Sequence, residues 1–434
     1  MRSRSLTYKK TLILLCDNYP LSAGEFFIDD EMRVIAPRFE KVVLYTASAK
    51  LDENLNRYIP DNAEVVRFSR QKLEAGKIKS FFRIFKPMFL RELAFAIHKL
   101  PMRYWVSAFK IMYVDIHRAT SLKNELQQFC DRSHLNVNDC VFYSYWHDYK
   151  ALALAMLRKS SGCACVARAH RWDVFADKNT IPYLPFKRFI LNNLSKTISI
   201  SKAGKEYFNT YVGNSDDKVV VSFLGKINER NILTEKRGDE VLICSCSNLI
   251  PVKQVDRIIE TISQLEINNL RWIHFGDGPL RAELETMAKK LLPNVKYEFR
   301  GIVPNNEILD FYASQYVDLF INLSSSEGIP VSIMEALSAG IPVVATKVGG
   351  TAEAVNSTNG FLVSAEFNTD EVVQIIINYL NSDSVQQQQY RKNAYDFWKG
   401  NFEAGKNYGA FAEILIGSTT IPSSNLCVNN GCCG

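Results

Sequence analysis

The sequence has 434 residues, more than one hydrophobic core usually serves, and this length fits two domains of roughly 200 residues each. Its 47% hydrophobic and 23% charged residues are ordinary for a globular protein, and no apolar run approaches the ~18 residues of a membrane-spanning helix. The net charge of +6 suits an anionic ligand or a membrane surface, but the basic residues are dispersed, so nucleic-acid binding is not expected.

The chain begins with a basic lead and a short apolar run, "TLILLC", over residues 11–16. A signal peptide would need a longer apolar run and a small-residue cleavage site, whereas "DNYP" follows here. The run therefore predicts a first β-strand, and we expect a cytoplasmic protein.

Short β-rich runs alternate with helical patterns along the chain, which predicts an α/β protein with two doubly wound parallel sheets. The expected strands lie at 11–16, 41–47, 63–68, 140–145, 163–169, 197–201, 241–247, 271–277, 296–301, 317–323, 342–348 and 360–364. We expect domains over 1–215 and 216–395, a crossover helix over 396–416 that packs back toward the first domain, and a flexible tail over 417–434.

Residues 77–113 mix Lys and Arg with Phe, Trp and Tyr in an amphipathic pattern. Such a segment can lie on an anionic membrane surface. Two ordinary helices that bury their apolar faces in the first domain would show the same pattern. The sequence leaves both interpretations open.

The ten cysteines form neither a disulfide framework nor a zinc motif. The pairs Cys163/Cys165 and Cys244/Cys246 lie within apolar strand patterns, where residues two apart share one face, so we expect buried thiols. The ending "LCVNNGCCG" is compatible with reversible lipidation or with a frayed terminus.

The most informative stretch is "SSSEGIPVSIMEALSAGIPVV" over residues 324–344. Ser332 and Glu335 have the spacing of a capping box, and Gly340 is placed to end the helix. That interpretation leaves Glu327 unexplained. A helix start at the carboxyl end of a parallel sheet binds phosphates, and carboxylates beside it suit sugar hydroxyls, so the stretch indicates a nucleotide-sugar site with Glu335 at the ribose and Glu327 at the transferred sugar.

The stretch "EGIPVSIMEALSAGIPVVATKVGGTAE" resembles the Glu-x7-Glu signature of the retaining GT-B glycosyltransferases of family four. The segments "CSNLIPVKQVDRII", "HFGDGPLRAELE" and "FRGIVPNNEILDFY" resemble further motifs of that family, in family order. The resemblance implies a GT-B fold, in which the first domain binds the acceptor and the second binds the donor.

The resemblance also implies donor contacts in the second half. Lys253 is expected to neutralise the donor diphosphate, and Asn248 stands where the family carries an arginine, which removes one charge from the phosphate clamp. The backbone at Ile329, Pro330 and Val331 is expected to line the sugar and diphosphate. Gly276 and Gly278 are expected mainly to allow close packing of chain and helix.

The first half resembles the family less closely. In "YPLSAGEFFIDDEM", Gly24 is expected near the donor phosphates, although a plain turn glycine fits equally well. In "VARAHRWDVF", His170 is expected to face the cleft between the domains as a catalytic residue beside Glu327. Arg171, Asp173 and His147 are acceptor-side candidates, and Asp173 also suits a helix N-cap.

The resemblance implies transfer of a sugar from a nucleotide-diphosphate donor to a glycan or polyprenyl-linked acceptor, with retention at the anomeric carbon. No Asp-x-Asp triplet is present, so neither a metal nor another cofactor is expected. The setting would be surface polysaccharide biosynthesis at the inner face of the cytoplasmic membrane. The alternatives are a non-catalytic scaffold subunit, suggested by Asn248, and a sugar phosphorylase or epimerase. A dinucleotide oxidoreductase is disfavoured, because no Gly-x-Gly-x-x-Gly follows the first strand.

Overall fold

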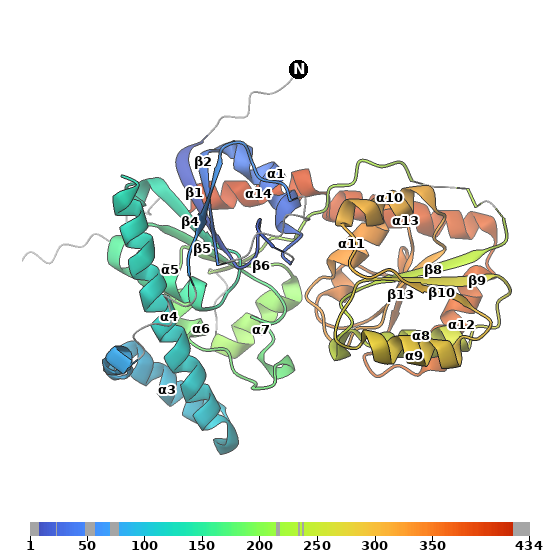
Figure 1. Cartoon of the computed structure of the whole chain (residues 1–434), viewed down its shortest axis with the longest axis horizontal. Helices are drawn as coiled ribbons and strands as arrows, with labels where there is room; N and C mark the ends of the chain where they lie inside the picture. The colour runs from blue at the N-terminus through green and yellow to red at the C-terminus, as the bar shows by residue number, and fades with distance from the viewer. Residues whose placement is uncertain are drawn as a thin grey trace, which may run out of the picture.

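The structure is a computed structural model that describes residues 8–22, 24–47, 57–69, 78–213, 218–232, 235–236 and 238–419. Two α/β lobes lie side by side (Figure 1). Residues 214–217, which span the expected domain boundary, and the cysteine-containing tail from residue 420 onward lie outside the described residues.

The N-terminal lobe is built on a seven-stranded parallel sheet in the order β3-β2-β1-β4-β5-β6-β7. Its strands are β1 (Tyr8–Cys16), β2 (Phe39–Thr46), β3 (Ala63–Arg67), β4 (Cys140–Ser144), β5 (Ala164–Ala169), β6 (Lys196–Ser199) and β7 (Val219–Val221). Strand β7 lies beyond the boundary expected at 215/216 and completes the first sheet by pairing with β6.

Helices cover both faces of this sheet, as right-handed crossovers between parallel strands require. They are α1 (Ile28–Ile35), η2 (Ile78–Phe85), α3 (Pro87–Lys99), η3 (Met102–Tyr104), α4 (Trp105–Arg132), α5 (Tyr149–Ser161), α6 (Lys187–Asn193) and α7 (Lys202–Val212). Helix α3 and the start of α4 project below the rest of the lobe in Figure 1.

The C-terminal lobe repeats this plan with a six-stranded parallel sheet in the order β10-β9-β8-β11-β12-β13. Its strands are β8 (Val241–Cys246), β9 (Leu270–Phe275), β10 (Lys296–Phe299), β11 (Leu319–Asn322), β12 (Val343–Thr346) and β13 (Gly360–Val363). Its helices are η6 (Pro251–Lys253), α8 (Val255–Ser263), α9 (Arg281–Leu291), α10 (Asn305–Ser314), α11 (Val331–Ser338), α12 (Thr369–Leu380) and α13 (Ser384–Asn401).

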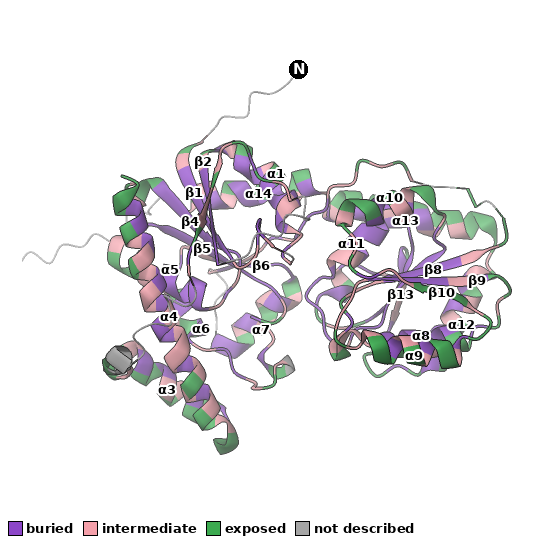
Figure 2. Cartoon of the chain, viewed as in Figure 1, coloured by how far each residue is buried: buried purple, intermediate pink, exposed green. Residues whose placement is uncertain are grey.

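The central strands are buried on both faces, which explains their nearly continuous apolar sequences (Figure 2). Cys163, directly before β5, and Cys165 within it have sulfur atoms 3.5 Å apart, and both are buried free thiols. Cys244 is also a buried free thiol, and Cys246 is partly exposed. Every strand expected from the sequence is present, so the predicted pair of doubly wound sheets is confirmed.

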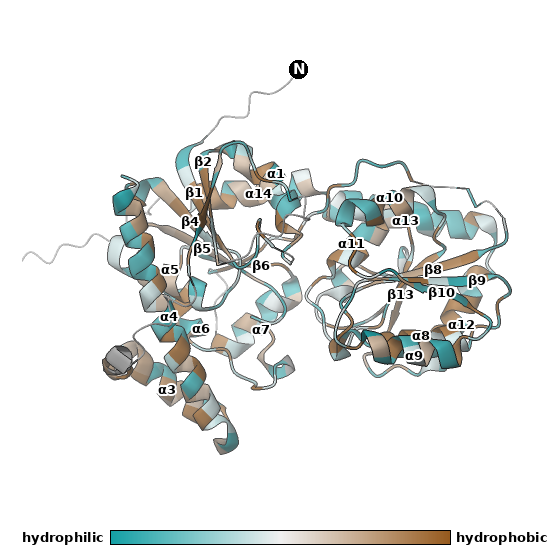
Figure 3. Cartoon of the chain, viewed as in Figure 1, coloured by the Kyte–Doolittle hydropathy of each residue, from teal (hydrophilic) through white to brown (hydrophobic). Residues whose placement is uncertain are grey.

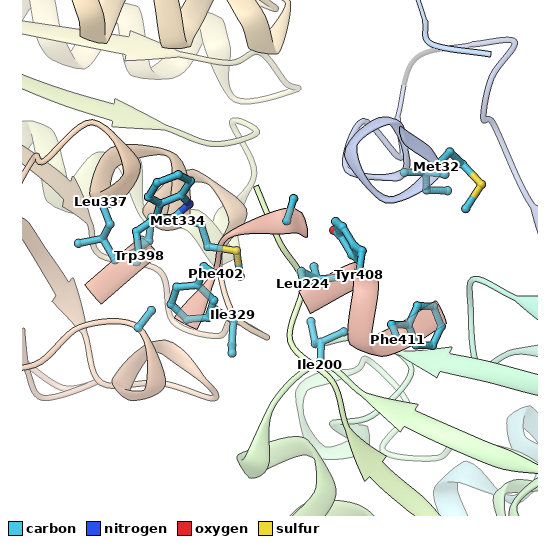
Figure 4. Packing of buried hydrophobic residues seen from close by; sticks show 14 of the residues in the cluster. Met32, Ile200, Leu224, Ile329, Met334, Leu337, Trp398, Phe402, Tyr408 and Phe411 are labelled. Atoms are coloured by element: carbon cyan, nitrogen blue, oxygen red, sulfur yellow. The ribbon is translucent and has the colours of Figure 1, made fainter. Parts of the chain in front are cut away.

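The last helix returns to the first lobe, as expected. Helix α14 (Ala404–Gly417) follows α13 and packs on α1 and the N-terminal sheet. The rings of Phe411 and Tyr143 lie 5.2 Å apart, and the Tyr408 hydroxyl donates to the Gly225 carbonyl at 3.0 Å. Figure 4 shows the apolar cluster that runs across the junction, from Trp398 and Phe402 to Tyr408 and Phe411.

The interpretation as ordinary helices of the first lobe accounts for part of the basic aromatic segment. Phe89, Ala96 and Met112 are buried in the core of the first lobe. Other large apolar side chains of the same segment are exposed, among them Met102 and Val106. Within the described ranges, no helix combines the length and the apolarity needed to cross a bilayer.

Candidate functional site

The order of strands reverses between β1 and β4 in the first sheet and between β8 and β11 in the second. Ligands of doubly wound sheets bind at such reversals, outside the carboxyl ends of the strands. A pocket of about 380 Å³ lies there, lined by both lobes. It brings together most of the expected site residues, namely His170, Arg171, Asn248, Lys253, Glu327, Ile329, Pro330, Val331 and Glu335.

Lys253 and Glu327 form an ion pair, with 2.6 Å between Lys253 Nζ and Glu327 Oε1. Glu327 is buried at 5% exposure, whereas Lys253 is only half-buried at the end of η6. The loop that follows β12 holds Glu327 in place, because Gly349 (φ +51°) lies so close that a Cβ there would be 1.8 Å from the Glu327 carbonyl oxygen. Only glycine fits this position, so the acid of the signature depends on a glycine far along the chain.

Helix α11 begins at Val331, directly after the Gly-Ile-Pro turn, and Pro330 at its N-cap supplies no side-chain hydrogen bond. The capping-box interpretation of Ser332 and Glu335 is therefore wrong, because the helix starts two residues too early for Ser332 to cap it. In the part of the chain that the structure describes, the amides of Val331 and Ser332 donate to no acceptor. Gly340 ends the helix with φ +68°, as expected.

Glu335 faces the pocket instead of capping its own helix. Its Oε1 accepts a hydrogen bond from Asn305 Nδ2 at 2.5 Å and lies 3.6 Å from Lys226 Nζ. Burial raises the pKa of Glu335 above its ordinary value, and the ammonium of Lys226 opposes that rise. Lys226 also pairs with Asp30 of α1 at 2.9 Å, so it links the two lobes beneath the pocket.

His170 follows β5 and has 7% exposure. Its ring packs against those of Tyr145 and Trp146, each with its centroid 4.6 Å away. Neither ring nitrogen has a hydrogen-bond partner among the described residues. Burial lowers the pKa of His170 well below its ordinary value, and the nearby Arg168 cation lowers it further, so the imidazole is neutral at pH 7.

Asp173 is buried and holds two loops together. Its carboxylate accepts hydrogen bonds from the backbone amide of His170 at 2.6 Å and from that of His147 at 2.7 Å. The His147 ring is fully buried, with Nδ1 2.9 Å from Lys187 Nζ and Nε2 3.2 Å from Thr197 Oγ1. Asp173 and His147 therefore lie behind the wall of the pocket, in positions that orient its surface.

Two other expected residues lie at the rim. Arg171 reaches across the cleft and donates from Nε to Ser326 Oγ at 2.8 Å. Asn248 is exposed in the loop after β8, where Gly276 packs so closely that a Cβ would lie 1.9 Å from the Ser247 carbonyl oxygen. This contact and a similar one at Gly278 match the packing role expected of both glycines.

Gly24 lies in the loop after β1 with φ +102°, and it does not line the pocket. The neighbouring Phe26 and Phe27 do so. Within this loop the Glu25 carboxylate accepts from the amides of Asp17, Asn18 and Tyr19. The expected donor contact of Gly24 stays a prediction.

A second pocket, of about 480 Å³, lies within the N-terminal lobe. It shares the half-exposed Trp172 with the cleft pocket, and its polar lining comes from α4, α6 and the loops after β4 and β5, including the acceptor-side candidates His147 and Asp173. Burial, followed by the charge of Asp148, raises the pKa of the lining residue Asp115 to about 7. Such a pocket suits a hydroxyl-rich group next to the cleft.

Sequence reasoning missed several residues that line or support the cleft pocket: Glu25, Phe26, Phe27, Trp146, Lys226 and Asn305. Lys226 carried one signal, a lone lysine after the apolar run "VVVSFLG". Asn305 is the first residue of α10, and the remaining residues lie in loops whose sequences show no periodicity. Among the described residues, no group of three or more His, Cys, Asp or Glu side chains is placed to hold a metal ion.

Residues 226–397 match the family model "Glycosyl transferases group 1". The second lobe is thus a group 1 glycosyltransferase domain. Among curated proteins, the chain is 27% identical over 225 residues to a phosphatidylinositol N-acetylglucosaminyltransferase subunit of Arabidopsis thaliana, covering 51% of this chain and 49% of that protein. It is 27% identical over 169 residues to the putative teichuronic acid biosynthesis glycosyltransferase TuaC of Bacillus subtilis, covering 39% and 40%. The chain thus spans half or less of the length of these relatives.

Solved structures show the same two-lobed architecture over nearly the whole chain. Anabaena Alr3699/HepE, solved in complex with UDP and glucose, has a TM-score of 0.64 at 18% identity, covering 94% of this chain and 99% of that one. The sucrose-phosphate synthase of Thermosynechococcus elongatus has a TM-score of 0.68 at 13% identity, covering 94% and 100%. The two lobes that the structure describes have the GT-B fold.

Proposed function

We propose that this protein is a glycosyltransferase that moves a sugar from a nucleotide-diphosphate donor to a hydroxyl of a glycan or lipid-linked acceptor, with retention. The main support for this proposal is the pocket between the lobes. There a lysine, two buried carboxylates and a helix start with unpaired amides meet a neutral histidine from the opposite lobe. These groups match the parts of a nucleotide-sugar: two phosphates flanked by hydroxyls.

In this assignment Lys253 and the amides of Val331 and Ser332 bind the donor diphosphate. The helix start contributes only ~0.3–2 kcal/mol, so the lysine carries most of the stabilisation of the leaving group. Glu335, held by Asn305, accepts hydrogen bonds from the ribose. The diphosphate draws the ammonium of Lys253 away from Glu327, whose carboxylate then accepts from hydroxyls of the transferred sugar.

Asn248 leaves the phosphate clamp one charge short, and Arg171 offers a replacement from the other lobe. Of the three cations that line the pocket, Lys226 and Lys253 pair with carboxylates, whereas Arg171 bonds to the Ser326 hydroxyl and forms no ion pair within the described ranges. We therefore assign Arg171 to the donor phosphates rather than to the acceptor. Binding of donor would then draw the two lobes together.

Retention follows if the acceptor hydroxyl attacks the anomeric carbon from the face that the diphosphate leaves. The new bond joins the acceptor oxygen to that carbon, the bond to the diphosphate oxygen breaks, and the hydroxyl proton passes to the departing phosphate. His170, neutral and without a hydrogen-bond partner in the described structure, orients a sugar hydroxyl beside the reacting carbon. No step in this scheme needs a metal, so transfer is expected to survive chelation by EDTA.

The relatives suggest the biological setting. One carries a name that places it in teichuronic acid biosynthesis, and another belongs to a transferase that acts on phosphatidylinositol. We infer a comparable role in surface polysaccharide biosynthesis, at the cytoplasmic face of a membrane. The polar pocket beside Trp172 is the place expected for the acceptor sugar.

A thermal-shift screen against UDP, GDP, ADP and TDP tests donor binding directly, because a ligand that binds only the native state raises the melting temperature. We expect one of these nucleotides to stabilise the wild type and to fail with Lys253→Ala, while Lys289→Ala on the exposed face of α9 behaves as wild type. NMR of the product then reports the anomeric configuration. No stabilisation by any nucleotide would overturn the proposal.

A second candidate is a scaffold subunit that keeps the fold without catalysis, and Asn248 in place of arginine favours it. Such a protein would bind nucleotide but would not turn it over. Slow release of sugar from the stabilising donor, abolished in Glu327→Gln, supports the transferase. Binding with no release under any condition supports the scaffold.

A further inference from the structure

The segment from Phe82 to Lys110 carries an unusual concentration of exposed apolar side chains. It comprises the end of η2, helix α3, η3 and the first turns of α4, and we call its outer face the basic apolar surface. Most of the large apolar side chains that the described residues expose lie on it: Phe82 (79%), Phe85 (62%), Leu90 (49%), Ile97 (44%), Met102 (74%), Trp105 (36%) and Val106 (67%). Elsewhere such side chains are scattered singly, and only a cluster of this kind signals an interaction surface.

In helix α3, the exposed apolar residues are distinct from those that pack into the hydrophobic core of the lobe. Phe89 and Ala96 on one side of the helix are buried against the lobe, together with Leu100 just beyond its end. Leu90 and Ile97 are exposed on the adjoining face, where a helix that faces water carries polar residues. Figure 3 shows this as apolar brown on α3 and on the lower part of α4. The helix is thus apolar on two faces, of which the protein covers one.

The charge of the molecule is concentrated on the same segment. Residues 77–113 contain eight Lys and Arg and a single acid, Glu92, whereas the whole chain has a net charge of +6. Glu92 is buried and accepts from the Tyr183 hydroxyl at 2.6 Å, so it does not neutralise the outer face. Five exposed basic side chains make no ion pair within the described ranges: Lys86, Arg91, Lys99, Arg103 and Lys110.

We propose that the basic apolar surface docks this protein on an anionic lipid bilayer. Its apolar side chains enter the boundary between headgroups and acyl chains, and the surrounding ammonium and guanidinium groups pair with lipid phosphates. Charge complementarity selects this partner, because an apolar face without acids and ringed by cations fits a negatively charged surface. Trp105, whose Nε1 already donates to the Leu100 carbonyl at 3.0 Å, adds an aromatic side chain at the depth such rings prefer.

Helix α4 connects this surface to the polar pocket of the N-terminal lobe. Val106 lies on the surface, and Asp115, nine positions further along, lines the pocket, so the two are roughly 14 Å apart along the helix. An acceptor whose lipid tail stays in the bilayer can therefore present its sugar in that pocket. This last step rests on the proposed transferase function, whereas the docking itself does not.

The test is co-sedimentation of the full chain with vesicles, measured without donor so that it is independent of catalysis. Vesicles of phosphatidylcholine with about a third phosphatidylglycerol are compared with pure phosphatidylcholine vesicles. We expect binding to the anionic vesicles alone, weakened by added salt because the contact is partly electrostatic. No binding to anionic vesicles, or equal binding to both, would overturn the proposal.

Two variants and a matched control locate the contact. Replacing Lys86, Arg91, Arg103 and Lys110 with Gln is expected to lower the partition onto anionic vesicles at least about tenfold, since each basic residue near such a membrane adds to binding. Replacing Leu90, Ile97, Met102 and Val106 with Ser is expected to do the same.

The control replaces exposed residues of the other lobe, with Lys289→Gln, Lys290→Gln, Ile302→Ser and Val385→Ser, and is expected to bind as wild type. Retention of the nucleotide-induced thermal shift shows that each variant is folded, and circular dichroism checks the fold should no nucleotide bind. A control that loses binding as strongly as the two variants would contradict the assignment. So would sedimentation velocity showing that the surface pairs two copies of the chain and leaves vesicles unbound.

Discussion

The two walls of the cleft differ in chemistry. The wall from the C-terminal lobe is charged and hydrogen-bonding, with the Lys253–Glu327 ion pair and Glu335 beside the start of α11. The wall from the N-terminal lobe is aromatic, with Phe27 and Trp146 around a neutral His170. The difference fits the proposed function, in which the C-terminal lobe supplies most of the groups for the charged donor and the N-terminal lobe adds Arg171 and a dry surface for the sugars.

The largest effect is expected from the charged wall. Lys253→Ala should lower the transfer rate by about 10²–10³, because it removes the main cation at the leaving group. Glu327→Gln should be as severe, since an amide cannot accept the same hydrogen bonds from the sugar. Donor turnover measures both, with Lys289→Ala as control. Near-normal turnover of either variant would break the assignment of this wall.

Moving a cation from one wall of the cleft to the other tests which residue supplies the second positive charge at the donor phosphates. Arg171→Met is expected to weaken donor binding roughly 10- to 100-fold, the range for one charge-assisted hydrogen bond of ~1.5–3 kcal/mol. Adding Asn248→Arg to that variant should restore much of the affinity, because the charge returns on the opposite wall. Calorimetric titration with the nucleotide measures both. If Arg171→Met binds as tightly as wild type, the lobes do not share the clamp.

The C-terminal wall could be predicted from the sequence because it is built from two contiguous loops. The first runs from Asn248 to Lys253 and the second from Glu327 to Val331, and in each the turn residues and the candidate site side chains are neighbours in the chain. The strands were predictable for the same reason: each is a short apolar run between turn signals.

The N-terminal wall could be predicted only in part. Phe27, Trp146 and His170 come from loops after three different strands, and only the folded sheet brings them together. The role of Lys226 depends on its pairing with Asp30 and Glu335, and no local sequence pattern predicts either pairing. His170 was expected because "VARAHRWDVF" resembles a family segment and because the strand pattern ends there.

The aromatic wall is expected to depend on Asp173. Asp173→Asn keeps the size of the side chain but loses the negative charge, and one of the two amides from His147 and His170 loses its acceptor. The free energy of unfolding should fall by about 1–3 kcal/mol. Urea denaturation measures it, with Asp61→Asn at an exposed turn as control. An unchanged stability would mean that Asp173 does not hold this wall together.

The smallest expected effect is a pH dependence of the free energy of unfolding, which tests whether the His170 ring is shielded from water. Burial, with the Arg168 cation as the second cause, lowers the pKa of His170 in the folded state below the ordinary 6.5. The unfolded chain therefore binds the extra proton, and His170 removes stability as the pH falls below about 6.5, by up to about 1.4 kcal/mol near pH 5.5.

NMR of the ring nitrogens of His170 should show a neutral imidazole down to about pH 5.5. The variant His170→Gln should lose less stability than wild type over the same range. A His170 that titrates near pH 6.5 would instead describe a solvated wall.

The central claim is that one pocket between the lobes holds the donor with its diphosphate on the charged wall. A crystal structure of the protein with the nucleoside diphosphate that raises its melting temperature tests this most directly. We expect phosphate oxygens within hydrogen-bonding distance of Lys253 Nζ and of the first amides of α11, and ribose hydroxyls at Glu335. A nucleotide bound elsewhere, or bound with Glu335 and Lys253 out of contact, would contradict the account.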